Sequence, residues 1–182
     1  TVTTNYPYNT DGVVRYTPTG GSLLDGVEEA FGYKDFLVLI EAKKDMAFSG
    51  DSRADRDKVL DNRAIVLAQV VYYFHKIREN EGTTPSAVVV AYNDEMFVLS
   101  GKVIRSYLDN DYDWSIAPSA AGEKNLELVK ALRKDKNVST IYVYHIGKNF
   151  DFNGPADRLF AAIRSTRFEK IMVTPDTLAR AF

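Results

Sequence analysis

The run Phe36-Leu37-Val38-Leu39-Ile40, followed directly by Glu41-Ala42-Lys43, decides the fold. Five apolar residues in succession predict a buried strand, and the polar triplet marks the point where that strand reaches solvent. Glu41 and Lys43 are two residues apart, so their side chains point to the same side of a strand. This is the only acidic-x-Lys triplet in the chain. We therefore expect a carboxylate and an ammonium group together at the end of a central strand.

The composition is that of an ordinary globular domain. The chain has 182 residues, 45% of them apolar and 26% charged, which fits a single domain. Its net charge is −2, without the basic excess of proteins that wrap DNA. The absence of cysteine excludes disulfides and thiolate metal sites. No twenty-residue apolar stretch or signal-peptide pattern is present, so we expect a cytoplasmic protein without membrane segments.

The rest of the chain alternates predicted strands and helices. Short apolar runs bounded by turn residues predict strands at 13–16, 25–31, 36–41, 87–92, 96–99, 141–145 and 171–173. Helical periodicity predicts helices at 58–79, 122–136 and 155–164, and a last helix after Pro175. Asp55 or Asp57 is the expected cap of the long helix, which follows a polar loop at 49–56. This alternation predicts an α/β (α+β) domain over 1–182, a mixed central sheet flanked by helices. Residues 13–100 form its expected core, and 101–182 complete the domain or lead to a following one.

The strands at 25–31 and 36–41 are expected to form a hairpin joined at residues 32–35. A three-residue loop or a bulge would place Asp25 opposite Glu41, on the side that also carries Lys43. A four-residue loop would turn Asp25 to the other face. We expect the first arrangement, which brings two carboxylates and one lysine together.

These residue types suit the hydrolysis of a phosphodiester. One or two carboxylates can hold Mg²⁺ with several waters, one of which can attack phosphorus. A nearby lysine adds a compact positive charge where negative charge develops. The alternative is that Glu41 and Lys43 form an ordinary ion pair at a solvated strand end.

A second signal lies on the long helix. Gln69 and Tyr73 are four residues apart and share one helix face. Tyr73 alone fits a core aromatic, but an amide on an apolar face requires hydrogen-bonding partners. His75 and His145 form no ligand motif, so we expect a packing or capping role for each, and Trp114 is expected to be a core or interface anchor.

Asp25, Glu41-Ala42-Lys43 and Gln69-x-x-x-Tyr73, in this order, resemble the PD-(D/E)xK nuclease superfamily and its RecB-like branch. Over residues 20–100 the chain most resembles the N-terminal nuclease domains of restriction–modification proteins that carry an adenine methyltransferase. Leu24 departs from the family pattern, in which a proline often precedes the aspartate. An acidic helix commonly precedes the hairpin in these nucleases, and the first 24 residues do not read as one.

The resemblance implies a restriction-endonuclease-like fold and a role for each motif residue. Asp25, Glu41 and the carbonyl of Ala42 would bind Mg²⁺, with Mn²⁺ as a substitute. Lys43 would be the catalytic lysine, and Gln69 and Tyr73 would orient the site.

The expected function is cleavage of double-stranded DNA by a module of a larger restriction–modification protein, with two copies meeting to cut both strands. Arg53, Arg56 and Lys58 would contact the DNA backbone. The chain begins at Thr1 without methionine and ends at Phe182 within a predicted helix, so we expect it to be a piece of a longer protein. The resemblance implies methyltransferase and target-recognition domains as partners. A repair nuclease of RecB type and a non-catalytic DNA-binding or scaffold domain are the alternatives.

Overall fold

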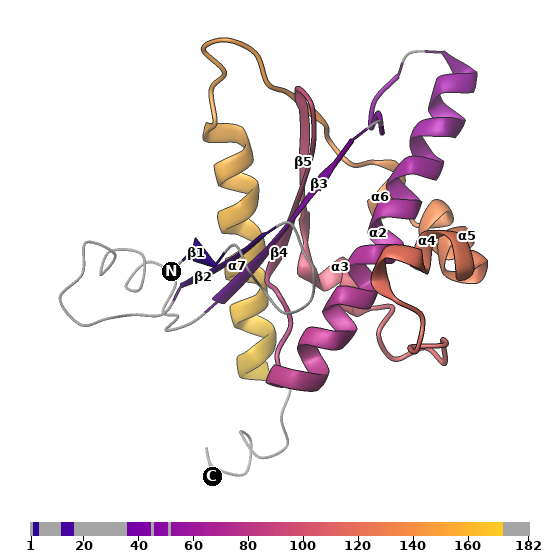
Figure 1. The fold of residues 1–182 in the computed structure, drawn as a ribbon. Helices are drawn as coiled ribbons and strands as arrows, with labels where there is room; N and C mark the ends of the chain where they lie inside the picture. Colours follow the sequence, from indigo (N-terminus) through magenta and orange to yellow (C-terminus); the bar gives the residue numbers. More distant parts are fainter. Residues whose placement is uncertain (1, 4–11, 17–35, 45, 51, 173–182) are drawn as a thin grey trace, which may run out of the picture.

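A computed structural model describes residues 2–3, 12–16, 36–44, 46–50 and 52–172 (Figure 1). Six strands form one sheet in the order β1-β2-β3-β4-β5-β6. β3 and β4 are parallel, and every other neighbouring pair is antiparallel. This mixed sheet confirms the predicted α/β architecture. The strands are β1 (Val2–Thr3), β2 (Gly12–Tyr16), β3 (Phe36–Lys43), β4 (Ala87–Tyr92), β5 (Glu95–Ser100) and β6 (Tyr144–His145).

Helices cover both faces of the sheet (Figure 1). The long helix α2 lies on one face and α7 on the other, and α4, α5 and α6 pack against α2. Parallel strands need a crossover connection, which α2 supplies between β3 and β4. The helices are α2 (Arg53–Glu81), α3 (Gly101–Arg105), α4 (Ala121–Lys124), α5 (Leu126–Lys134), α6 (Lys136–Ser139) and α7 (Asn153–Met172), with a short 3₁₀ helix η1 (Pro118–Ala120).

Side chains alternate along β3 between two hydrophobic cores. Leu37 and Leu39 point toward α2 and join the main core, whereas Val38 packs with Ala87 and Ala162 on the side of α7. The same alternation puts Glu41 and Lys43 on the α2 face. The apolar part of β3 is therefore buried on both faces, and the polar end of the strand lies beneath α2.

The start of α2 differs from the prediction. The helix begins at Arg53, and Ser52 is its cap, because the Ser52 hydroxyl accepts a 3.0 Å hydrogen bond from the backbone N–H of Asp55. Neither Asp55 nor Asp57 is the cap. The predicted polar loop therefore ends at residue 52, and Arg53, Arg56 and Lys58 lie on the helix. Gly82 ends α2 in the left-handed conformation, with φ of 68°, which a glycine adopts at little cost.

The strand paired with the first half of β3 also differs from the prediction. β2 runs antiparallel to β3, with Gly12 opposite Ile40 and Tyr16 opposite Phe36. The other edge of β3 is taken by β4. Both edges of residues 38–40 are therefore occupied. The predicted hairpin strand at 25–31, with Asp25, lies outside the described residues.

The last third of the chain is more finely divided than predicted. The expected helix at 122–136 is split into α4, α5 and α6, because Asn125 and Asp135 each accept a backbone N–H of the following turn and start a new helix. The expected strand at 141–145 is reduced to β6. Instead of a strand at 171–173, α7 continues through Met172, and residues from 173 onward lie outside the described part of the chain.

The core also extends beyond the predicted limit at residue 100. Leu128, Leu132 and Val138 are fully buried in the main core with the residues of α2. Ile163 of α7 is buried on the other face of the sheet. Residues after 100 thus contribute buried side chains on both faces of the sheet.

Candidate active site

Lys43 connects the end of β3 to the middle of α2. Its Nζ lies 2.6 Å from Glu41 Oε1 and donates a 2.5 Å hydrogen bond to Gln69 Oε1. Glu41 and Lys43 meet because alternation along β3 puts both on the α2 face. We call Glu41, Lys43 and Gln69 the Lys43 cluster. Two separate sequence signals, the triplet and the helix glutamine, are therefore brought together.

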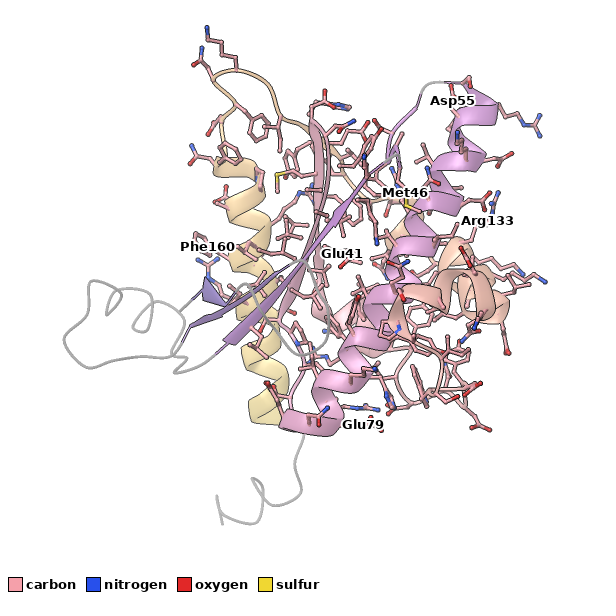
Figure 2. The ribbon with its side chains drawn as sticks, in the orientation of Figure 1. Glu41, Met46, Asp55, Glu79, Arg133 and Phe160 are labelled. Atoms are coloured by element: carbon pink, nitrogen blue, oxygen red, sulfur yellow. The ribbon has the colours of Figure 1, made fainter. Side chains whose placement is uncertain are left out.

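The Lys43 cluster lies below the surface. The Glu41 side chain is 4% exposed and that of Lys43 is 18% exposed. Figure 2 shows Glu41 between β3 and α2. An ion pair this buried costs much more desolvation than a surface pair, and it gains little net stability in return. The alternative of a solvated surface pair at the strand end is therefore wrong for these two residues.

Both ends of the Gln69 amide are hydrogen-bonded. Its Oε1 accepts from Lys43, and its Nε2 donates to the backbone carbonyl of Ser119 in η1 at 3.3 Å. A half-buried amide needs such partners, as the sequence analysis expected. The contact to η1 fixes which side of the amide faces Lys43. Ser119 gave no signal in the sequence, because it acts through a backbone carbonyl that only the fold brings near.

Tyr73 lies in the main core one helical turn after Gln69 and is 5% exposed. The preceding residue, Tyr72, donates to the carbonyl of Asp113 at 2.8 Å and accepts from Asn125 at 3.1 Å. Burial raises the pKa of Tyr72. Trp114 stacks on His75 with 4.0 Å between ring centroids. This part of α2 thus anchors residues 113–125, and the packing roles expected for His75 and Trp114 are confirmed.

The donor groups at the end of β3 suit a hydrated Mg²⁺ ion. The Glu41 carboxylate and the Ala42 carbonyl are oxygen donors, and Mg²⁺ is often held by one or two carboxylates while it keeps several waters. In the described part of the chain, no group of three or more His, Cys, Asp or Glu side chains could hold a metal ion. The other predicted ligand, Asp25, lies outside that part.

The three basic residues predicted to touch DNA lie far from the Lys43 cluster. Arg53, Arg56 and Lys58 are exposed in the first two turns of α2. At about 1.5 Å per residue, they stand roughly 16–24 Å from Gln69 along the helix axis. They are not brought together with Lys43, and any phosphate they contact would be several nucleotides from the one at the site.

A second polar cluster, which no motif in the sequence indicated, holds the segment after β3. Glu95 at the start of β5 accepts the backbone N–H of Phe48 at 2.7 Å and the Ser49 hydroxyl at 2.8 Å. Arg63 of α2 donates to the Phe48 carbonyl at 2.7 Å and to the carbonyls of Val138 and Ser139. Burial lowers the pKa of Arg63, and Glu95 opposes that shift. This clasp ties residues 48–49 to both the sheet and α2.

Searches of family models, curated proteins and solved structures found no significant match to this chain. None of the helices in the described ranges combines the length and the apolar character needed to cross a membrane.

Proposed function

We propose that this chain is a metal-dependent endonuclease domain that hydrolyses phosphodiester bonds of double-stranded DNA. One observation carries the proposal, namely that Lys43 contacts both Glu41 and Gln69 beneath α2. The sequence pattern singled out these three residues by their chemical type. A chance similarity of sequence would not require their side chains to be in contact. Resemblance to the PD-(D/E)xK nucleases gives this contact its functional meaning.

Each member of the Lys43 cluster would have one task. Lys43 would offer its ammonium to a phosphate oxygen, where negative charge increases as the bond breaks. Gln69 would hold Lys43 in place, and Tyr73 would support Gln69 from the core. Glu41, with the Ala42 carbonyl and Asp25, would hold Mg²⁺, which when bound would neutralise phosphate charge and supply an activated water.

The same proposal includes the setting of the domain. Sequence recognition would come from other domains of a longer chain, a methyltransferase and a target-recognition domain among them, in the cytoplasm. Arg53, Arg56 and Lys58 would contact the backbone of flanking DNA. Two copies would have to meet to cut both strands of a duplex.

Calorimetric titration with Mn²⁺ tests the metal site independently of cleavage. We expect one site in the wild-type chain that is lost in Glu41→Gln and weakened in Asp25→Asn. Glu79→Gln, which changes an exposed carboxylate on α2, should leave the site unchanged. If the wild type binds no Mn²⁺, or if Glu41→Gln binds it equally well, the proposed metal site is wrong.

A further inference from the structure

A cavity of about 480 Å³ opens between β5, α3, residues 137–142 and α7. This volume lies within the range of about 300–1,000 Å³ typical of pockets for small ligands. The Lys43 cluster contributes none of its lining residues. The cavity is therefore a separate candidate site, which the proposed nuclease chemistry does not use.

The lining of this cavity combines an apolar floor with positive charge. Val98, Leu99 and Val103 contribute to the floor, and the charged residues among the described lining are Lys102 and Arg158. The described lining contains no Asp or Glu. The whole chain has a net charge of −2, so a lining whose described charged residues are both basic departs from that average. Such a lining favours a ligand with a flat or apolar part and an anionic group.

Tyr142, at the mouth of the cavity, is 56% exposed although it is a large aromatic residue. The guanidinium carbon of Arg158 lies 5.1 Å from the centroid of the Tyr142 ring and 5.7 Å from that of Tyr144. Arg158 Nε also donates a 2.6 Å hydrogen bond to the Tyr144 hydroxyl. These contacts hold the guanidinium over the Tyr142 ring, so the exposed aromatic residue and a cation are presented together.

The aromatic surface continues beyond the cavity. Ring centroids are 4.7 Å apart between Tyr142 and Tyr144, 6.3 Å between Tyr144 and Phe150, and 4.8 Å between Phe150 and Phe152. Phe152, at the far end of this row, is again 56% exposed. A single nucleotide would fill the cavity and leave the far end of the row uncovered.

We propose that this cavity and its aromatic row bind an unpaired nucleic-acid strand. Exposed aromatic rings stack on bases of any sequence, and adjacent cations pair with the backbone phosphates. The cavity would hold one base against Tyr142, with Arg158 and Lys102 near its phosphates. Paired DNA keeps its base faces covered by neighbouring bases, so a duplex could not use the rings in this way.

Fluorescence anisotropy with a labelled oligothymidylate, in EDTA, tests this proposal on the whole chain. We expect the single strand to bind more tightly than either a duplex of the same length or thymidine monophosphate. EDTA prevents metal-dependent cleavage, so the strand stays intact during the measurement. The outcome thus does not depend on whether the Lys43 cluster is catalytic.

Variants of the aromatic surface make the test specific. Tyr142→Ala should weaken strand binding at least about 5-fold, the lower limit expected for one lost stacking contact. Tyr142→Phe keeps the ring and should retain binding, and Arg158→Gln should reduce the dependence of affinity on salt. Phe160→Ala, an exposed aromatic of α7 outside the cavity lining (Figure 2), is the matched control and should bind normally.

Three results would overturn the proposal. They are no binding of the single strand, equal or tighter binding of the mononucleotide, and an affinity for the single strand that Tyr142→Ala leaves unchanged. Thermal unfolding of each variant, compared with that of the wild type, shows that a lost affinity does not come from a lost fold.

Discussion

Lys43 Nζ and Gln69 Oε1 are 2.5 Å apart, although 26 positions separate the two residues in the chain. Their contact joins the polar end of β3 to the middle of α2. Gln69 is in turn held by the carbonyl of Ser119, so three separate segments fix one ammonium group. The position of Lys43 is therefore set by the fold and not by the strand alone.

Removal of the Gln69 amide should lower the rate of DNA nicking while leaving metal binding intact. Gln69→Leu deletes the acceptor for Lys43 and the donor to Ser119, so the ammonium loses its fixed position. We expect at least about a ten-fold lower rate, which corresponds to about 1.4 kcal/mol of transition-state stabilisation. Plasmid nicking and Mn²⁺ titration measure the two properties separately.

Asn62→Leu is the matched control, because Asn62 is an amide of the same helix that bonds the carbonyl of Ala47 away from Lys43. It should nick plasmid at the wild-type rate. A Gln69→Leu protein as active as the wild type would show that Gln69 does not position Lys43.

Mg²⁺ should stabilise Lys43→Ala more than it stabilises the wild type. This variant removes the Lys43 ammonium from the buried Glu41 carboxylate, and breaking a buried ion pair costs up to about 3–5 kcal/mol. A metal ion that binds this carboxylate restores part of that loss. Urea unfolding with and without Mg²⁺ measures the difference.

Lys44→Ala, which changes the exposed neighbouring lysine, should show neither the loss of stability nor the additional stabilisation by Mg²⁺. An equal effect of Mg²⁺ on Lys43→Ala and on the wild type would contradict metal binding at Glu41.

His75 should make the fold less stable below neutral pH. Burial is the largest cause that lowers the pKa of His75, Arg78 lowers it further, and Glu79 opposes the shift. The unfolded chain takes up this proton near pH 6.5, before the folded chain does, so stability falls as the pH drops through and below that value. Between about pH 7.5 and about pH 5.5, the wild type should therefore lose more stability than His75→Gln.

Urea unfolding of both proteins at the two pH values gives this comparison. Above about pH 7.5, the free energy of unfolding should change with pH to the same extent in both proteins. The same pH dependence in His75→Gln as in the wild type would show that this imidazole does not titrate differently on folding.

Arg63→Met should destabilise the fold by about 3 kcal/mol or more, because it leaves buried carbonyls and Glu95 without their cationic partner. Arg133→Met breaks ion pairs with Asp57 and Asp61, which are about half exposed or more, and should cost no more than about 1 kcal/mol. Denaturant unfolding measures both losses of stability. Equal losses in the two variants would contradict the proposed role of the clasp.

The parts of the fold that depend on local pattern could be predicted from the sequence. The apolar run before Glu41 predicted β3, helical periodicity predicted most of α2, and the short apolar runs at 87–92 and 96–99 predicted β4 and β5. For the candidate site, the identity of Glu41, Lys43 and Gln69 followed from the motifs. Their contact then follows from strand alternation and from the crossover of α2 over β3.

The parts that depend on long-range placement could not be predicted. The partner of β3 is β2, which is distant in sequence, and a nearer apolar run offered an equally plausible pairing. Ser52, Asp55 and Asp57 are all good caps, and only the observed bond to the Asp55 N–H selects Ser52. The Ser119 carbonyl and the Arg63–Glu95 clasp carry no local pattern, because both arise from elements brought together by folding.

The most direct test of the central claim compares nicking of supercoiled plasmid by the wild type and by Lys43→Ala, in Mg²⁺, with Mn²⁺ titration of the same samples. A closed circle has no ends, so nicking also separates an endonuclease from an enzyme that trims ends. The proposed role of Lys43 predicts that the wild type nicks the plasmid, whereas Lys43→Ala binds Mn²⁺ but leaves the plasmid intact. Nicking by Lys43→Ala at the wild-type rate would contradict it.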